Sequence, residues 1–244
     1  MPSVELGNDA VRSGKRVELV SGQDSYLITL DNEGKAMRNV LIVNAHLVYE
    51  GWSEGRLNAH LASVIEAEMR ARGYQVRHTH IEQGYDPEEE VEKHCWADLI
   101  VLQSPVNWFG APWIHKKYLD EVFNAGLASQ KLIVSDGRTR EDPSQQYGSG
   151  GLMQGKQLMM SLTWNAPESA FGNVEQLVYE GGTADDAFLH IAACYRFCGC
   201  QVLPSFNCFD VLKVPDVVGN LERLKRHLSE YLDYSEPVAA SDVA

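Results

Sequence analysis

From residue 39 onward, short continuous apolar runs alternate with longer amphipathic stretches, and this alternation constrains the fold most strongly. Strands are expected over residues 39–44, 75–81, 98–103, 131–135, 156–163 and 200–206. Helices are expected over residues 57–72, 87–95, 112–123, 183–198 and 216–234. Because the strand runs do not alternate with polar residues, both faces of the sheet are expected to be buried. The pattern predicts an α/β three-layer sandwich with a five-stranded, or slightly extended, parallel sheet between helices.

The two ends of the chain lack this regularity. Residues 1–36 are polar and are expected to be an N-terminal extension. Residues 17–20 and 26–30 could pair as a small hairpin, although a disordered extension or a vector-derived leader fits the composition equally well. Residues 37–235 are expected to form one domain, followed by a disordered tail over 236–244.

Charge and apolar content exclude several classes of partner. The formal net charge is −13 at pH 7, which repels nucleic acid and anionic lipid, so neither is expected to bind. No apolar run approaches the roughly 20 residues that cross a bilayer, and no signal peptide is evident, so no membrane insertion is expected. The expected compartment is the cytoplasm.

Five cysteines are present, and four of them fall between Cys194 and Cys208. The odd number does not suit a paired disulfide framework. A zinc site is disfavoured because Cys198 and Cys200 lack the usual two-residue spacing. We therefore expect reduced core thiols and no metal. Motifs of the form GxSxG, HExxH, GxxxxGK[ST] and CxxC are also absent, which removes support for hydrolase, zincin, nucleotide-triphosphatase and thiol-redox functions.

In parallel sheets of this kind, ligands bind beyond the carboxyl ends of the strands, where the strand order reverses. The expected post-strand segments are 46–58, 104–110, 136–151 and 163–166. In the first, Ser53 and Gly55 precede a helix, whose free amides could hold a phosphate while His46 and Arg56 add positive charge. The alternative, that Ser53 simply caps the helix, is left open.

Aromatic residues mark the other segments. Residues 104–113 hold three aromatics between prolines and a glycine, and this rigid rim suits a fused ring. For Trp113 we favour a buried position at a helix start. The loop 135–151 places glycines beside Tyr147 and could wrap a ligand. Residues 161–167 end a strand with backbone donors that could stabilise negative charge developing on a bound ring as it is reduced. The alternative is that Trp164 is simply a buried core residue.

Together these segments resemble the flavodoxin-like NAD(P)H:quinone oxidoreductases, most closely the bacterial modulator of drug activity B family. The resemblance covers about residues 38–232. It is carried by Trp96-Ala97-Asp98, by Gly110 to Trp113 with Lys116-Lys117-Tyr118, by Ser135 to Arg140 with Asp142-Pro143-Ser144, by Tyr147 to Leu152, and by Ser161 to Pro167.

The resemblance implies non-covalent FAD, NADPH as co-substrate, a quinone as acceptor, and a homodimer with each flavin close to the subunit interface. It implies two-electron, ping-pong transfer without an essential protein acid or base, with Tyr147 and Thr163 as hydrogen-bonding candidates. The implied cofactor-binding residues, of which His46 is a looser match to a histidine of the animal quinone reductases, are His46, Ser53, Glu54, Gly55, Arg56, Leu57, Asn58, Pro105, Val106, Asn107, Trp108, Phe109, Tyr147, Thr163, Trp164, Asn165 and Ala166.

Three alternatives remain open. The first is an azo- or nitro-aromatic reductase on the same scaffold. The second is a flavin-binding regulatory subunit of a potassium-efflux system, in which turnover is incidental. The third, an FMN electron shuttle, is disfavoured because 244 residues and paired aromatic loops exceed what a small carrier needs.

Overall fold

The computed structural model describes residues 15–21, 24–30 and 38–232. In the first part of the chain, β1 (Lys15–Ser21) and β2 (Asp24–Leu30) pair as an antiparallel hairpin. The expected tail over 236–244 and the last two residues of the expected 216–234 helix lie outside the described residues.

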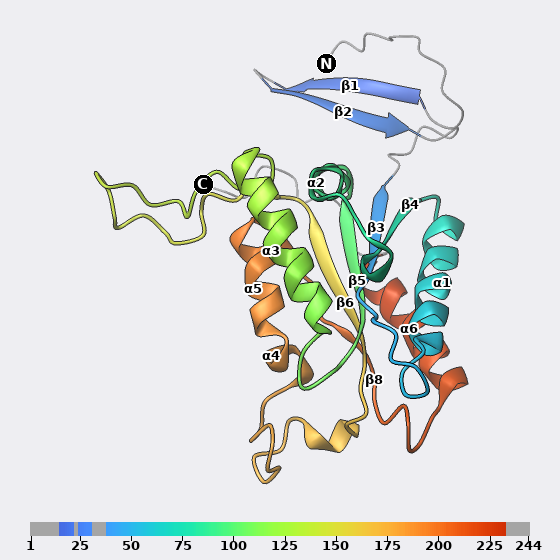
Figure 1. The fold of residues 1–244 in the computed structure, drawn as a ribbon. Coiled ribbons are helices and arrows are strands. Elements are labelled where there is room, and N and C mark those ends of the chain that lie inside the picture. The colour runs from blue at the N-terminus through green and yellow to red at the C-terminus, as the bar shows by residue number, and fades with distance from the viewer. Residues whose placement is uncertain (1–14, 22–23, 31–37, 233–244) are drawn as a thin grey trace.

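A parallel sheet forms the centre of the molecule (Figure 1). Its strand order is β4-β3-β5-β6-β7, and β8 also pairs with β6. The strands are β3 (Asn39–Asn44), β4 (Gln75–His80), β5 (Leu99–Pro105), β6 (Gln157–Thr163), β7 (Gln201–Val202) and β8 (Phe206–Cys208). Because the chain first adds β4 on one side of β3 and then β5 on the other, the order reverses between β3 and β5, and a ligand site is expected at that point.

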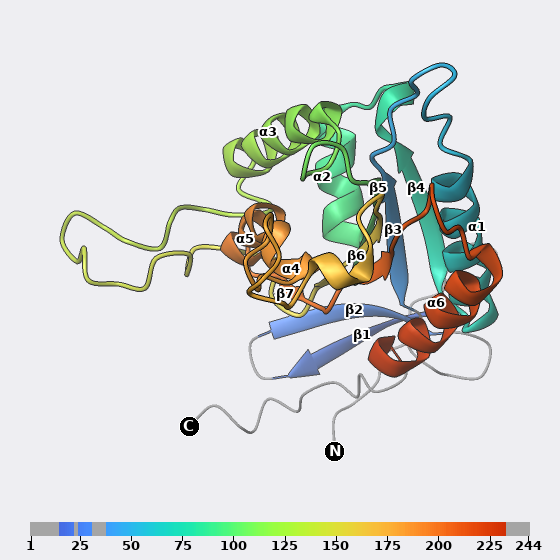
Figure 2. The same ribbon diagram turned by 90° about the horizontal axis from the view of Figure 1, so that it is seen from below.

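Helices cover both faces of the sheet (Figure 2). One face packs against α1 and α6, and the other against α2, α3 and α5. The helices are α1 (Arg56–Ala71), α2 (Pro87–Trp96), α3 (Trp113–Ala128), α4 (Ala184–Ala187), α5 (Leu189–Phe197) and α6 (Val217–Leu232), with short turns η1 (Ile81–Gln83) and η2 (Glu168–Ala170). The expected flavodoxin-like three-layer sandwich is confirmed.

The expected strand over residues 131–135 is wrong. This run forms bends around an isolated antiparallel bridge between Ile133 and Gly151. Its backbone bonds to the loop that follows it: the amide of Val134 donates to Gly150 O at 2.9 Å, and Leu152 N donates to Leu132 O at 2.9 Å. Leu132 and Ile133 are buried, which explains the apolar signal. The loop 135–151 therefore precedes β6 and lies where strands begin, not where they end.

Two further expected elements are divided. The expected helix over 183–198 breaks into α4 and α5 at Phe188, whose φ of −104° and ψ of 12° depart from helical values. The expected strand over 200–206 becomes β7 and β8, separated by a segment that contains Pro204. Proline has no amide hydrogen to give to a ladder, so the strand is interrupted there.

All five cysteines are free thiols, and Cys198, Cys200 and Cys208 are buried. Burial raises the pKa of each of these three to about 12. They pack as small apolar side chains rather than as thiolates. Within the described residues, no group of three or more His, Cys, Asp or Glu side chains is placed to hold a metal ion.

In the described ranges, no helix combines the length and the apolar character that crossing a bilayer requires.

Replacing His115 with leucine is expected to reduce the loss of unfolding free energy that the protein shows as the pH falls below 6.5. Burial, with a smaller effect of His190, lowers the pKa of His115 from 6.5 to about 3 in the fold. Between these values the unfolded chain binds a proton that the folded chain does not, so stability falls as pH falls. At pH 5 the loss is about 2 kcal/mol. Urea unfolding at pH 8 and pH 5 should show this extra loss only in the wild type; equal losses in both proteins would contradict it.

Candidate cofactor site

A pocket of about 790 Å³ opens beyond the carboxyl ends of the central strands. This volume suits a small-molecule or cofactor site. Segments 51–58, 105–109 and 163–167 line the pocket, together with Tyr179 and residues 211–213. The structure therefore brings together all the expected cofactor contacts except His46 and Tyr147, although these contacts are separated by more than a hundred positions in the chain.

The start of α1 presents free backbone donors to this pocket. The cap residue is Gly55, with a φ of 72°, and no side chain of the described residues caps the helix. The alternative that Ser53 caps α1 is thus wrong. The first bond inside the helix runs from Ala59 N to Gly55 O at 2.9 Å, which leaves the amides of residues 56–58 available. Uncapped amides at the positive end of a helix are suited to bind phosphate.

His46 lies beneath this helix start rather than in the pocket wall. Its side chain is buried, and Nε2 lies 3.4 Å from Ser53 Oγ. A Cβ atom added at Gly55 would approach the His46 ring to 2.5 Å, so glycine is required for the close contact. Burial lowers the pKa of His46, which favours the neutral ring, so the ring supplies less charge than expected. Positive charge in the wall comes from Arg56 and Lys213 instead.

A strained turn holds the aromatic rim. Trp108 and Phe109 have φ values of 48° and 69°, and Asn107 and Gly110 close the turn with two backbone hydrogen bonds. Positive φ at two consecutive aromatic residues costs free energy and is typical of functional sites. The Trp108 side chain is 91% exposed and lines the pocket. Trp113, which was expected to be buried, is 64% exposed at the start of α3.

The Trp164 turn combines core packing with free donors. The Trp164 side chain is buried among Phe171, Phe188 and Phe209, and its Nε1 donates to Asn207 Oδ1 at 2.8 Å. Its amide also bonds to Cys208 O at 2.8 Å. The side chain is therefore structural, as the alternative interpretation held, while the backbone lines the pocket. The amides of residues 165 and 166 make no hydrogen bond within the described part of the chain and can bind a ligand.

Asn58 and Thr163, which line the pocket, belong to a buried chain of hydrogen bonds that begins at Gln103 behind the pocket wall. Gln103 Nε2 at the end of β5 donates to Asn58 Oδ1 at 2.7 Å. Asn58 Nδ2 in the first turn of α1 donates to Thr163 Oγ1 at 3.3 Å, at the end of β6. This chain of hydrogen bonds connects α1 with the two strands that carry the other two turns.

Tyr147 lies at the opposite end of the sheet from this pocket. It belongs to the loop before β6, packs against Phe197 at a centroid distance of 5.0 Å, and has Arg138 above its ring. The ring is 62% exposed. Within one copy of the chain, Tyr147 and the pocket do not meet.

Several lining residues were not among the expected cofactor contacts. Gly51, Trp52 and Pro167 lie in the expected segments, whereas no expected segment included Tyr179, Val211, Leu212 and Lys213. Residues 211–213 follow β8, and Val211 N donates to Trp164 O at 3.0 Å. The rule that ligands bind at carboxyl ends applies to β8 as well. Had the 200–206 run been divided into two strands at Pro204, residues 211–213 would have been predicted to lie at the pocket.

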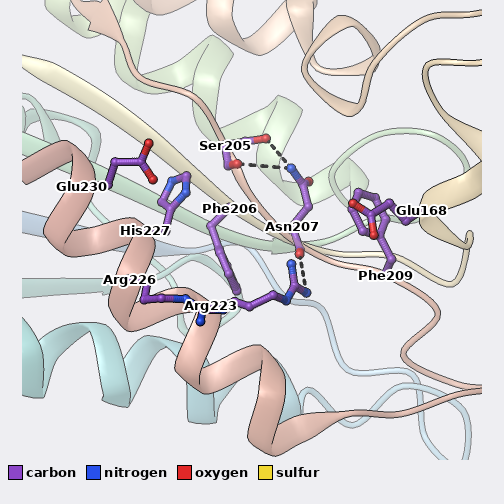
Figure 3. A pocket seen from close by; sticks show the side chains of 9 residues that line it. All are labelled: Glu168, Ser205, Phe206, Asn207, Phe209, Arg223, Arg226, His227 and Glu230. Carbon is purple, nitrogen blue, oxygen red and sulfur yellow. Dashed lines mark hydrogen bonds between the residues drawn. The ribbon is translucent and has the colours of Figure 1, made fainter.

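A second hollow of about 330 Å³ lies between α6 and β8 (Figure 3). Arg223 Nη2 donates to Asn207 O at 3.1 Å, and Asn207 Nδ2 donates to Ser205 Oγ at 2.7 Å. The wall mixes Glu168 and Glu230 with arginines. Because these polar groups largely satisfy one another and the charges oppose, this hollow is a weaker candidate for a ligand site than the first pocket.

Comparisons with known proteins agree with this geometry. A family model described as a flavodoxin-like fold matches residues 38–232. The chain is 41% identical over 192 residues to the NADPH:quinone oxidoreductase MdaB of Haemophilus influenzae, covering 79% of this chain and 98% of that protein. A provisionally named quinone reductase of Klebsiella pneumoniae superposes with a TM-score of 0.63 at 22% identity, covering 82% and 87%. An azoreductase of Bacillus anthracis gives 0.55 at 16% identity, covering 80% and 100%.

Proposed function

Because the chain belongs to a family of proteins with a flavodoxin-like fold, we propose that it is a flavin-dependent oxidoreductase that transfers hydride from NAD(P)H to a quinone. The observation that carries the proposal is the pocket in which the uncapped amides of α1, the Trp108 turn and the Trp164 turn face one space. The name of the Haemophilus influenzae relative supports the same reaction. We further propose FAD as the flavin and NADPH as the preferred reductant.

The residues present fit a flavin. Amides of residues 56–58 would hold its phosphates, with Arg56 adding charge, and Lys213 is a second cation in the wall. The rim at Trp108 and Phe109 would lie against the ring system. Amides of residues 165 and 166 would donate to the ring where negative charge develops on reduction.

When bound, the flavin supplies a ring that accepts hydride from a nicotinamide and delivers it to a quinone. The protein holds each planar substrate in turn against the same open face, which Trp108 borders. Shared use of one face gives a ping-pong order, in which oxidised nicotinamide leaves before the quinone enters. No protein nucleophile is needed for hydride transfer, and Thr163 contributes a hydrogen bond.

Anaerobic reduction tests the proposal directly. The purified protein, reconstituted with FAD, should lose its visible flavin absorbance on addition of NADPH, and menadione should restore it. Extraction of the cofactor and mass measurement separate FAD from FMN, and the same titration with NADH measures nucleotide preference. A protein that takes up no flavin, or whose flavin neither nucleotide bleaches, would refute the proposed function.

An azo-aromatic reductase is the nearest competing function. The exposed Trp108 rim favours flat aromatic acceptors in general, because stacking selects planarity rather than one functional group. Turnover of the reduced protein against a panel of quinones and azo dyes distinguishes the two. Faster reoxidation by every azo dye than by any quinone would assign the second function.

A homodimer accounts for Tyr147. Since this side chain lies at the strand starts of its own copy, we propose that it completes the flavin site of a second copy. In a two-fold dimer each loop then serves the other pocket. Replacing Tyr147 with alanine is expected to weaken FAD binding about tenfold without dissociating the dimer, because one aromatic contact is lost. Flavin fluorescence titration and light scattering measure the two quantities.

Subunit mixing shows whether the tyrosine acts across the dimer. Tyr147→Ala leaves the pocket intact but removes the donated ring, whereas Gly55→Ala damages the pocket but keeps the tyrosine. A mixed dimer of the two variants contains one complete site if Tyr147 acts across the interface. Recovery of tight FAD binding after subunit exchange is the expected result. Absence of recovery, with exchange verified by tagged subunits, would contradict the cross-subunit role.

A further inference from the structure

Three polar residues form a row across the sheet beneath the pocket. Asn44, Gln103 and Ser161 are register partners on β3, β5 and β6, so they share the face that packs against α1. All three are buried. A polar row at this depth replaces apolar contacts and needs hydrogen-bond partners. Such a row therefore requires a reason other than core packing.

Hydrogen-bond direction in this region is set by Gln103. Its Nε2 donates to Asn58 Oδ1 at 2.7 Å, which makes the oxygen side of the Asn58 amide face the strand. The Asn58 amide nitrogen then faces Thr163 and donates to Thr163 Oγ1 at 3.3 Å. Thr163 Oγ1 is thus an acceptor towards Asn58. Its own hydroxyl proton has no acceptor in the described part of the chain, and Thr163 lines the pocket.

The orientation of Gln103 has a cost. Within the described ranges of the chain, Gln103 Oε1 is buried without a hydrogen-bond partner, and so is Ser161 Oγ in the neighbouring register position. Buried unsatisfied polar atoms are unfavourable and are kept where function requires the arrangement. An apolar residue at position 103 would remove the cost but would also release the Asn58 amide.

We propose that Gln103 is a positioning residue that makes Thr163 a hydrogen-bond donor to the flavin. Without the Gln103 donor, the Asn58 amide can turn over, and Thr163 then donates to Asn58 Oδ1 instead of into the pocket. Gln103 itself does not line the pocket and acts through Asn58. The inference rests on the proposed flavin site and assigns the role of one buried residue within it.

Flavin affinity and midpoint potential test this role. Gln103→Leu should bind reduced flavin about tenfold more weakly relative to oxidised flavin, because a donor is lost where negative charge develops. Tenfold corresponds to a midpoint about 30 mV more negative for a two-electron couple. Thr163→Val should give the same shift, Thr163→Ser should restore the wild-type potential, and the Gln103→Leu/Thr163→Val double variant should shift no further than either single variant.

Ser161→Ala is the matched control, since it removes the neighbouring unpartnered hydroxyl of the same row and should leave the potential unchanged. If Gln103→Leu does not fold, Thr163→Val and Thr163→Ser still test whether the Thr163 hydroxyl donates to the flavin, because the Thr163 side chain lies at the pocket. Additive shifts, or a wild-type potential in Thr163→Val, would overturn the inference while leaving flavin binding intact. A wild-type protein that takes up no flavin would refute the proposed function, and the inference with it.

Discussion

Gly55→Ala should lower the affinity of the protein for FAD by at least about 100-fold, which corresponds to a loss of about 2.7 kcal/mol. Gly55 has a φ of 72°, and a Cβ atom there would lie 2.5 Å from the His46 ring. The left-handed conformation alone costs a side chain about 1–2 kcal/mol. His46 cannot withdraw freely, because its side chain is buried and its backbone amide donates to Asn44 Oδ1 at 3.0 Å. The start of α1 must therefore move, and with it the amides that face the pocket.

The chain offers a control that separates strain from collision. Gly51 lies in the same segment with a φ of 69°, but a Cβ atom there meets no atom of the described residues within 4 Å. Gly51→Ala carries the conformational cost without the clash and should bind FAD within about tenfold of wild type. Adding His46→Ala to Gly55→Ala removes the ring that obstructs the Cβ atom and should recover part of the affinity. Flavin fluorescence titrations of the four apoproteins measure these differences.

Circular dichroism should show that Gly55→Ala retains its fold. The packing of α1 depends on Leu61, Ile65 and Met69, which lie one turn or more beyond the substituted residue. Tight FAD binding by the Gly55→Ala variant would show that the start of α1 is not part of the flavin site.

The fold and most of the pocket were predictable for one physical reason. Strands buried on both faces appear as continuous apolar runs, and parallel strands all end at the same edge, so the turns after β3, β5 and β6 had to meet. Residues as distant as Ser53 and Ala166 could be assigned to one site from this argument. No pairwise contact had to be known.

What could not be predicted depends on tertiary contacts. The run at Leu132 and Ile133 is as apolar as a strand, but it bonds to its own downstream loop, and local pattern does not distinguish these partners. That error placed Tyr147 at the wrong end of the sheet. Trp113 is exposed although large aromatic side chains favour burial. Glu90 is one of four glutamates between residues 88 and 92, yet it is buried.

Glu90→Ala is expected to lower the free energy of unfolding by about 3–5 kcal/mol, a large share of the stability of a typical domain. The carboxylate is 1% exposed and joins three elements. It accepts hydrogen bonds from Thr79 Oγ1 on β4 at 2.8 Å, Lys93 Nζ on α2 at 2.6 Å and Tyr118 OH on α3 at 2.7 Å. Alanine leaves the hydroxyls of Thr79 and Tyr118 without this acceptor and Lys93 without its charged partner. It also leaves a cavity where the Glu90 side chain was, and all of these effects destabilise the fold.

Glu89→Ala is the matched comparison, because Glu89 is the adjacent residue of α2 and is exposed. Its loss should change the stability by less than about 1 kcal/mol, the usual range for a charge in the first turn of a helix. Glu90→Gln keeps the size and one acceptor oxygen and should fall between the two. Tyr118→Phe combined with Glu90→Ala should cost less than the sum of the single changes, since both remove the same hydrogen bond.

Glu90 and its partners Thr79, Lys93 and Tyr118 lie on the sheet face opposite α1. Loss of the Glu90 carboxylate should therefore lower the stability of the protein and leave its affinity for FAD unchanged. Urea unfolding of the apoproteins measures the first quantity, and FAD titration at low temperature, where the variant remains folded, measures the second. A Glu90→Ala protein as stable as Glu89→Ala would show that the buried carboxylate contributes nothing beyond an exposed one. A variant that is fully folded but has lost FAD binding would instead show that α2 and α3 transmit their positions to the Trp108 turn, which directly precedes α3.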